Sequence, residues 1–325
     1  MTFIARWHPW LVFIGAVALQ LIAFDPRISP YDEGVILVGA ERVLRGDVPY
    51  RDFWTLYGPG QFFLISWLFS VFGPTDLVVR AVGIVAKAAI TGLAYVTVTR
   101  AATRSRALVA ALVVLGLLIV VRHDPFPLFP ALALSMAAIL LVERGLKREL
   151  THLVHAGICT GLATTFRHDL GAYGFIAIGA SICFVRAARG SGWSIVETAH
   201  STGRLLGRYV AGVLIVLVPV FGLFLHAVPV GDLYECLIET PLRIYPRVRS
   251  TPFPRIGDLT AAGVWQPENL FPFVVYLPFL VSIWVVALAV RRRHTDRTRR
   301  VPQPRPVRED AFLVFLVTLT ACSSR

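Results

Sequence analysis

The sequence predicts an all-α, polytopic membrane protein with about eight or nine transmembrane helices and with interfacial helices in a long first external loop. Three observations support this fold class. Hydrophobic residues make up 56% of the 325 residues, whereas charged residues make up only 16%. The mean hydropathy is +0.66. Apolar runs recur along the whole chain, and many approach the roughly 20 residues that a helix needs to cross the hydrocarbon core. We therefore expect a single membrane-embedded domain over residues 1–325.

The distribution of charge excludes other classes of protein. The net charge is +12, but the basic residues form short clusters between the apolar runs, which is the pattern that orients membrane helices. We therefore expect contacts with membrane lipids and no nucleic-acid partner. Of the four cysteines, three lie in apolar runs and one lies in a polar loop, so the sequence shows no disulfide framework.

The first apolar run, residues 7–24, predicts a transmembrane helix. Arg6 precedes this run and Asp25 follows it. The positive-inside rule therefore places the N-terminus in the cytoplasm and the next loop on the external side. No small-residue cleavage site follows the run, so we expect a retained helix and not a removed signal peptide.

The next stretch, SPYDEGVILVGAERVLRGDVPYRDFWTLYGPG, concentrates acidic, aromatic, glycine and proline residues in an otherwise aliphatic chain. Its first half predicts a short amphipathic helix that lies on the membrane surface. Ser29 suits the N-cap, Pro30 suits the first helical position, and Gly46 is expected to end the helix. Asp32 and Glu33 lie at the start of this helix, where we expect the chemistry.

A second interfacial helix is expected over residues 62–72. This run is apolar but only 11 residues long, about half of what a crossing requires. If it crossed the membrane, the basic loop at residues 100–106 and every later basic loop would lie outside, against the positive-inside rule. The first external loop therefore extends over residues 25–77.

The rest of the chain alternates between apolar spans and basic loops. The spans begin near Leu77, Ala107, Phe126, Leu153, Gly171, Arg208 and Phe271. Most lysines and arginines then lie in cytoplasmic loops at residues 100–106, 144–148, 186–208 and 291–308. The Pro-rich segment 291–310 is expected to be a basic linker that contacts anionic lipid head groups. A last apolar run begins at Ala311 and is too short to span, so the chain is expected to be C-terminally truncated.

Two external turns repeat the tripeptide Arg-His-Asp on the side of the membrane that carries Asp32 and Glu33. Either these turns converge on one external cavity, or each is solvated and its arginine pairs with its own aspartate. Both readings stay open for the first turn, and the local pair is favoured for the second. The residues are Arg122, His123 and Asp124 in the first turn and Arg167, His168 and Asp169 in the second.

Two cations lie on one face of the second span, because Arg80 and Lys87 are seven residues apart. Arg80 is near the outer end, and Lys87 is about two turns deeper. An ionisable lysine at that depth should face a cavity or a partner, so it binds an anionic ligand or pairs with an acid for packing.

The last external loop, residues 228–270, is long, rich in proline and mixed in charge. These features suggest a binding lid, although a solvated loop is the simpler alternative. Arg243 and Arg247, on either side of Tyr245, would suit a phosphate and a sugar ring.

These parts fit one kind of chemistry. A carboxylate at the outer surface can act as general base on an acceptor hydroxyl, while nearby cations neutralise the phosphate that leaves on a lipid carrier. The sequence has no P-loop and no dinucleotide fingerprint, so no nucleotide site is expected.

The sequence also resembles the membrane-embedded glycosyltransferases of the GT-C type, in particular the dolichyl-phosphate-mannose protein mannosyltransferases (glycosyltransferase family 39) and their aminoarabinose transferase relatives in bacteria. The similarity covers about the first 190 residues and is strongest up to Arg100. It is carried by Tyr31-Asp32-Glu33-Gly34, ERVLRGDVPYRDF, Tyr57-Gly58-Pro59, the FGP that ends the short apolar helix, and Arg80.

The resemblance implies transfer with inversion from a polyprenyl-phosphate sugar to an extracytoplasmic glycan, lipid or protein acceptor, in the bacterial inner membrane. It implies Asp32 as general base, Glu33 beside it, and Asp124 as an acid of the second external loop. Tyr57, Arg80 and Lys87 are expected to bind the donor. The cofactor stays open: a divalent metal ion at Asp32, Glu33 and Asp124 is one alternative, and a metal-free site is the other.

Two other classes of function fit the composition. A transporter or lipid flippase would also place charges at outer helix ends, but the sequence lacks a corresponding pair of helices that are broken at mid-depth. A structural membrane subunit would make the region around Asp32 dispensable. We rank the enzyme first, the transporter second and the subunit third.

Overall fold

A computed structural model describes residues 4–24, 32–100, 102–120, 125–147, 150–189 and 195–249. Within these ranges the chain forms helices and no strand, which confirms the all-α fold class. Several predictions lie outside the described residues. They are the N-cap Ser29 and first helical position Pro30 of the first interfacial helix, the first Arg-His-Asp turn, the second half of the lid-like loop, the span near Phe271, the basic linker and the final apolar run.

The chain forms two compact units. The first comprises Met1–Ala172 and Gly203–Leu242, and the second comprises Tyr173–Thr202 and Arg243–Arg325. The described part of the second unit is helical and contains a hydrogen bond from Arg186 Nη2 to Ser201 Oγ of 2.6 Å. The candidate site residues are mostly in the first unit.

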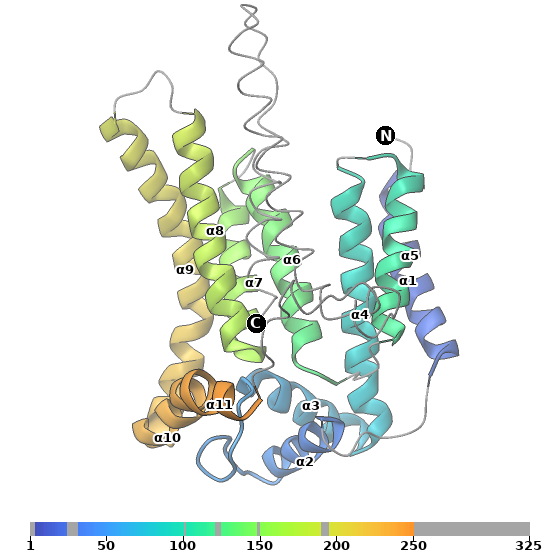
Figure 1. Cartoon of the computed structure of the whole chain (residues 1–325), viewed down its shortest axis with the longest axis vertical. Coiled ribbons are helices and arrows are strands. Elements are labelled where there is room, and N and C mark those ends of the chain that lie inside the picture. Colours follow the sequence, from blue (N-terminus) through green and yellow to red (C-terminus); the bar gives the residue numbers. More distant parts are fainter. Residues whose placement is uncertain are drawn as a thin grey trace, which may run out of the picture. The chain divides into compact units, whose positions relative to one another are not determined.

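Two groups of long helices form the core of the first unit (Figure 1). In one group, α1 (Ile4–Ile22), α4 (Asp76–Val98) and α5 (Arg104–Val120) pack against one another. In the other, α6 (Leu128–Gly145) pairs with α7 (Thr151–Phe166). Contacts between α4 and α6 join the two groups. α4 is therefore the helix on which the unit is assembled.

The remaining helices follow α7 along the chain. α8 spans His168–Arg189 and α9 spans Ile195–Ala227. They are followed by the short α10 (Val230–Tyr234), by a π-helix, η1 (Glu235–Ile244), and by α11 (Tyr245–Arg249).

Four helical segments in the described ranges are long and apolar enough to cross a membrane: Asp76–Val98, Leu128–Gly145, His168–Arg186 and Ala199–Ala227. They correspond to the spans predicted near Leu77, Phe126, Gly171 and Arg208. Helices α1, α5 and α7 also form where spans are predicted, but their apolar parts are shorter. The membrane protein class is thus confirmed, while the total of eight or nine spans stays a prediction.

The two predicted interfacial helices are present as α2 (Asp32–Leu44) and α3 (Pro59–Phe72). Both lie across one end of the long helices, next to the start of α4 and the end of α7 (Figure 1). α2 ends just before Gly46, which has a φ of +100°, a value that glycine adopts without strain. The crosswise placement of α3 is consistent with the prediction that residues 62–72 do not cross the membrane.

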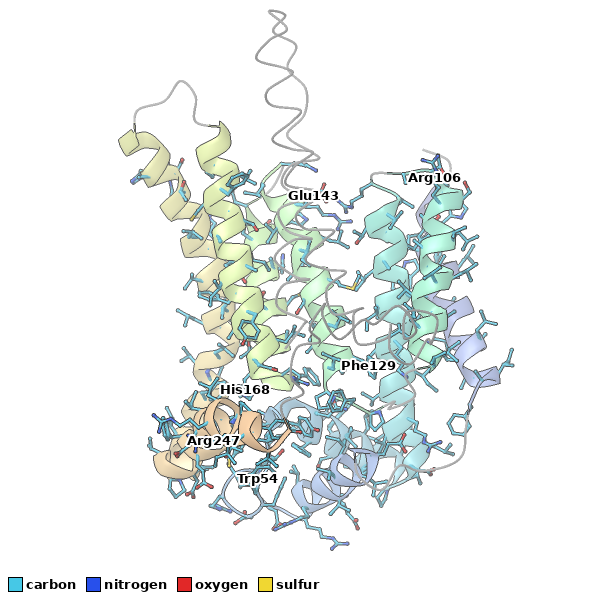
Figure 2. All side chains as sticks on the ribbon, in the orientation of Figure 1. Trp54, Arg106, Phe129, Glu143, His168 and Arg247 are labelled. Carbon is cyan, nitrogen blue, oxygen red and sulfur yellow. The ribbon has the colours of Figure 1, made fainter. Side chains whose placement is uncertain are left out.

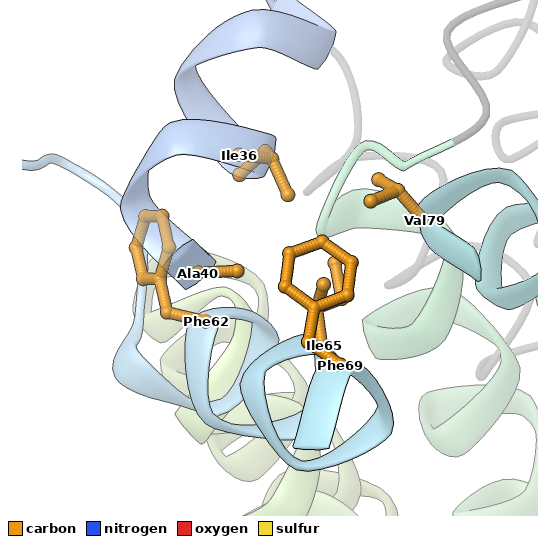
Figure 3. Close-up of a cluster of buried hydrophobic side chains, with 6 residues drawn as sticks. All are labelled: Ile36, Ala40, Phe62, Ile65, Phe69 and Val79. Atoms are coloured by element: carbon orange, nitrogen blue, oxygen red, sulfur yellow. The ribbon is translucent and has the colours of Figure 1, made fainter. Parts of the chain in front are cut away.

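A buried apolar cluster fixes α2 and α3 on α4 (Figure 3). The buried side chains of α3 recur at intervals of three and four residues, so they share one helix face. Each such side chain contributes about 1.5–3 kcal/mol when it is fully buried. The cluster consists of Ile36, Ala40, Phe62, Ile65, Phe69 and Val79. This packing holds the acidic start of α2 next to α4.

A glycine fixes the other end of α3. The backbone N–H of Gly58 donates to the carbonyl of Phe166, at 3.1 Å. A Cβ atom at Gly58 would lie 2.1 Å from the carbonyl oxygen of Thr165, which no side chain can tolerate. Only glycine therefore permits this close approach of α3 to the end of α7.

Candidate active site

The centre of the candidate site is a buried ion pair between α2 and α4. Arg80 Nη2 lies 3.1 Å from Glu33 Oε2, and the two side chains are only 3% and 10% exposed. The guanidinium also lies over the ring of Phe24, with Cζ 5.0 Å from the ring centroid. The structure thus brings together two residues that the sequence places 47 positions apart.

This ion pair fixes the start of α2. Asp32 is the first residue of α2, directly before Glu33. The side chain of Asp32 lies outside the described residues. Its backbone is adjacent to that of Glu33, so the ion pair that positions Glu33 also positions the backbone of Asp32. The contact between Glu33 and Arg80 therefore places the backbone of Asp32 near the start of α4.

Lys87 lies deeper on the same face of α4 and is 1% exposed. Its Nζ atom is 4.7 Å from the ring centroid of Phe129, near the start of α6 (Figure 2). An aromatic face stabilises a desolvated ammonium by about 2 kcal/mol. The ring of Phe129 is thus one neighbour of Lys87, and both expectations for this residue, an anionic ligand or an acidic packing partner, stay predictions.

Tyr57 and Arg167 are brought together around one aromatic side chain. The ring of Tyr57 contacts the ring of Phe126 edge to face, at a centroid distance of 5.5 Å. Arg167 Cζ lies 5.7 Å from the centroid of the same ring. The loop before α3, the start of α6 and the end of α7 therefore meet at Phe126.

The second Arg-His-Asp turn forms a local ion pair. Arg167 donates from Nε and Nη2 to the two carboxylate oxygens of Asp169, at 2.9 and 2.5 Å. This is the local pair that the sequence favours for this turn. His168 begins α8 between these two residues and is partly buried (Figure 2). The corresponding residues Arg122, His123 and Asp124 lie outside the described residues.

Gln61 is a buried polar residue that no sequence pattern identifies. This residue of α3 is fully buried, and its Nε2 donates to the carbonyl of Pro125, at 2.8 Å. Within the described part of the chain its Oε1 has no hydrogen-bond partner. A buried acceptor of this kind is rare and is a candidate ligand-binding group, because leaving it unpaired is costly. A single glutamine in an apolar run has no motif that could have identified it.

The loop between α2 and α3 is held by hydrogen bonds. Arg42 Nη2 donates to the carbonyl of Asp52 at 2.7 Å, and the backbone N–H of Val48 donates to Asp52 Oδ2 at 2.7 Å. The Arg51 guanidinium, with help from that backbone N–H, lowers the pKa of Asp52 to about 2. Asp52 is therefore ionised over the physiological range, and it is a weaker proton acceptor than an ordinary carboxylate.

Tyr50 is the tightest point of this loop. It is the one non-glycine residue with positive φ in the described ranges, at +72°. Its hydroxyl donates to the carbonyl of Tyr57, at 2.8 Å, and its ring packs against Phe224 of α9. Burial raises the pKa of Tyr50 well above its ordinary value, and nearby Cys236 adds to this effect. The loop is thus a defined structure that leads directly to Tyr57.

Arg243 and Arg247 belong to the second unit and are exposed, in η1 and α11 (Figure 2). Their expected role in substrate binding stays a prediction. Among the described side chains, no group of three or more His, Cys, Asp and Glu could hold a metal ion. The expected acidic set of Asp32, Glu33 and Asp124 is only partly described, so metal binding there also stays open.

The fold defines a polytopic membrane protein with buried, paired charges under two crosswise helices at one end of its long helices. Residues 57–221, about half of the chain, match the family described as dolichyl-phosphate-mannose-protein mannosyltransferase. The chain belongs to this family and is a membrane glycosyltransferase of the GT-C type. No curated protein and no solved structure gives a significant match. The matched part includes Tyr57, Arg80 and Lys87, whereas α2 with Asp32 and Glu33 precedes it.

Proposed function

We propose that this glycosyltransferase moves a sugar from a polyprenyl-phosphate-linked donor to an extracytoplasmic acceptor, with inversion at the anomeric carbon and with Asp32 as general base. The observation that carries this proposal is the buried ion pair of Glu33 and Arg80. It joins the residue next to Asp32 to a helix within the part of the chain that matches the family. The donor tail lies in the bilayer, and the sugar lies at the level of α2 and α3.

The proposed reaction is a single displacement. The Asp32 carboxylate accepts the proton of the acceptor hydroxyl, and the hydroxyl oxygen forms a bond to the anomeric carbon on the face opposite the phosphate. The bond from that carbon to the phosphate oxygen breaks, and the electron pair leaves with the polyprenyl phosphate. One displacement at the anomeric carbon inverts its configuration.

Positive charge near the leaving phosphate lowers the barrier, because it stabilises charge that develops in the transition state. We assign this role to Arg80 and Lys87, which are buried in a region of low dielectric where their field is weakly screened. Glu33 acts as a positioning residue, since it holds Arg80 and the first turn of α2. This division of roles explains why two adjacent acids have different tasks.

The sugar and the rest of the donor are assigned to the residues around Phe126. Tyr57 and Arg167 gather at its ring, and Gln61 lies next to it through Pro125. A tyrosine, an arginine and an unpaired amide oxygen offer a ring face, a phosphate ligand and a hydroxyl acceptor.

Loop residues complete the proposed site. We assign acceptor or donor contacts to the first Arg-His-Asp turn and to the lid-like loop that contains Arg243 and Arg247. These assignments require that both loops face the external side of the membrane, as the charge distribution predicts.

The experiment uses the full chain in liposomes with a mannosyl polyprenyl phosphate, since the description of the family names a mannosyl donor. The anomeric configuration of the product is read by NMR and is expected to be opposite to that of the donor. Asp32→Asn should lower the transfer rate by about 10²–10⁴-fold, the usual contribution of a general base. Asp47→Asn, which removes an acid of the same loop that pairs with Arg42, is the control and should keep the native rate.

Retention of configuration would contradict a single displacement. Transfer by Asp32→Asn within threefold of the native rate would remove Asp32 as the base, even if the donor class were right.

A further inference from the structure

A cavity of about 440 Å³ lies between α1, α4 and α5. One face of α1 lines it, from His8 through Gly15 to Leu19, and one face of α5 lines it from Arg104 to Leu115. On each helix the first and last of these positions are 11 residues apart, or roughly 16 Å along the axis. The cavity is therefore elongated and runs parallel to helices that lie in the membrane.

The polar lining residues gather at one end of this cavity. α1 and α5 start there and α4 ends there, so the first turns of α1 and α5 meet the last turns of α4 (Figure 1). His8, Tyr95, Arg104 and Ser105 lie at this end, and Arg104 Nη1 is 3.4 Å from His8 Nε2. The rest of the lining is aliphatic apart from Thr91. The cavity thus has a cationic mouth and an apolar body.

The described lining contains an arginine and no carboxylate. One further arginine, Arg106 in the first turn of α5, lies near this mouth in the sequence (Figure 2). Arg100, just after α4, is paired with Glu143 and is not counted as free positive charge. Basic pockets between membrane helices bind anionic lipid head groups, because the head group pairs with the cation and the tail follows the apolar groove. The volume of about 440 Å³ is within the usual range for small-molecule pockets, so the cavity takes part of a lipid, such as one acyl chain, and not a whole phospholipid.

This cavity is separate from the candidate active site. Arg80 is in the second turn of α4, whereas Tyr95 is near its other end, roughly 22 Å further along the helix. The predicted topology places the mouth on the cytoplasmic side, opposite to the side of the sugar transfer.

We propose that the cavity between α1, α4 and α5 binds one anionic phospholipid, with its phosphate at Arg104 and an acyl chain along Gly15 toward Leu19. The guanidinium donates to the phosphate oxygens, and the hydroxyls of Tyr95 and Ser105 offer further donors. The bound lipid fills the groove that the three helices leave between them.

The test uses the full chain, purified in detergent and analysed by native mass spectrometry with phosphatidylglycerol and phosphatidylcholine of identical acyl chains. The native chain should bind phosphatidylglycerol at least tenfold more tightly than phosphatidylcholine. Arg104→Gln should reduce this preference to less than threefold. Equal binding of the two lipids by the native chain would overturn the proposal.

A second pair of variants tests the groove itself. A Cβ atom at Gly15 meets nothing within 4 Å, so the side chain of Gly15→Leu enters the groove without a clash at Cβ, and leucine favours the helix over glycine. This variant should lower the binding of phosphatidylglycerol at least tenfold. Gly116→Leu is the matched control, because Gly116 has equally open surroundings on α5 but does not line the cavity.

Unchanged binding in Gly15→Leu would show that the lipid lies elsewhere. A competition arm distinguishes the other lipid phosphate of this system, which the proposed function places at the active site: binding of polyprenyl phosphate that Gly15→Leu lowers at least tenfold, with binding of phosphatidylglycerol unchanged, would also overturn the proposal.

Discussion

Breaking the ion pair of Glu33 and Arg80 should strongly destabilise the protein. The perturbation is Arg80→Met, which keeps an apolar side chain of similar length on α4 and removes the cation. Glu33 would then be a buried carboxylate without the guanidinium that lies 3.1 Å away in the native chain. The reciprocal change, Glu33→Met, leaves Arg80 buried with its contact to Phe24 but without its carboxylate.

The magnitude follows from burial. Removing one partner of a buried ion pair costs about 3–5 kcal/mol, whereas an exposed pair contributes about 0–1 kcal/mol. With side chains 3% and 10% exposed, this pair belongs to the first class. Replacing both partners by apolar side chains removes the uncompensated charge, so the double variant should regain most of the loss. The coupling energy is expected to be on the order of 3 kcal/mol.

The assay is SDS-induced unfolding of the purified chain, followed by circular dichroism, for both single variants and the double variant. The matched control is the pair of Glu41 in α2 and Arg45 directly after it, where the arginine side chain is 72% exposed. The same set of methionine substitutions there should show a coupling of about 0.5 kcal/mol or less. Purely additive effects of the two substitutions, or a loss below about 1 kcal/mol in the free energy of unfolding of each single variant, would show that Glu33 and Arg80 are not a strongly coupled buried ion pair.

Three further changes probe other contacts. Gly58→Ala should lower the free energy of unfolding by about 1–3 kcal/mol or more in the same assay, because its Cβ would overlap the carbonyl of Thr165. The control Gly174→Ala, in open surroundings on α8, should be neutral or stabilising by up to about 1 kcal/mol. Equal effects of the two substitutions would contradict the close approach of Gly58 to Thr165. Lys87→Met should weaken donor binding at least tenfold in a binding titration, and unchanged affinity would assign the residue to packing. Burial raises the pKa of Tyr50, so the unfolded state ionises first, and the stability present below pH 10 should fall as the pH rises above 10. Tyr50→Phe should reduce this fall in alkaline unfolding curves, and an unchanged curve would show that Tyr50 does not cause it.

Local features of the fold could be predicted from the sequence. Gly46 ends α2, and the 11-residue run at 62–72 forms a helix crosswise to the bundle, because glycine punctuation and run length are properties of a few neighbouring residues. The pairing of Arg167 with Asp169 could also be anticipated, since the two residues are almost adjacent.

Contacts between distant segments could not be predicted in the same way. The periodicity of α4 places Arg80 and Lys87 on one face, but it does not say which helix packs on that face. The contact with Glu33 and the ring of Phe129 over Lys87 depend on how α2 and α6 dock on α4. The buried amide of Gln61 and the cavity beside Gly15 likewise exist only after three segments have packed together.

The most direct test of the central claim is the choice of donor. Liposomes that contain the full chain would be supplied in parallel with a radiolabelled mannosyl polyprenyl phosphate and with the corresponding nucleotide sugar, in the presence of a mixture of membrane and peptide acceptors. Label should move to an acceptor from the polyprenyl-phosphate donor alone, and Asp32→Asn should abolish this transfer. Label that moves from the nucleotide sugar with equal efficiency would contradict the proposed lipid-carrier chemistry.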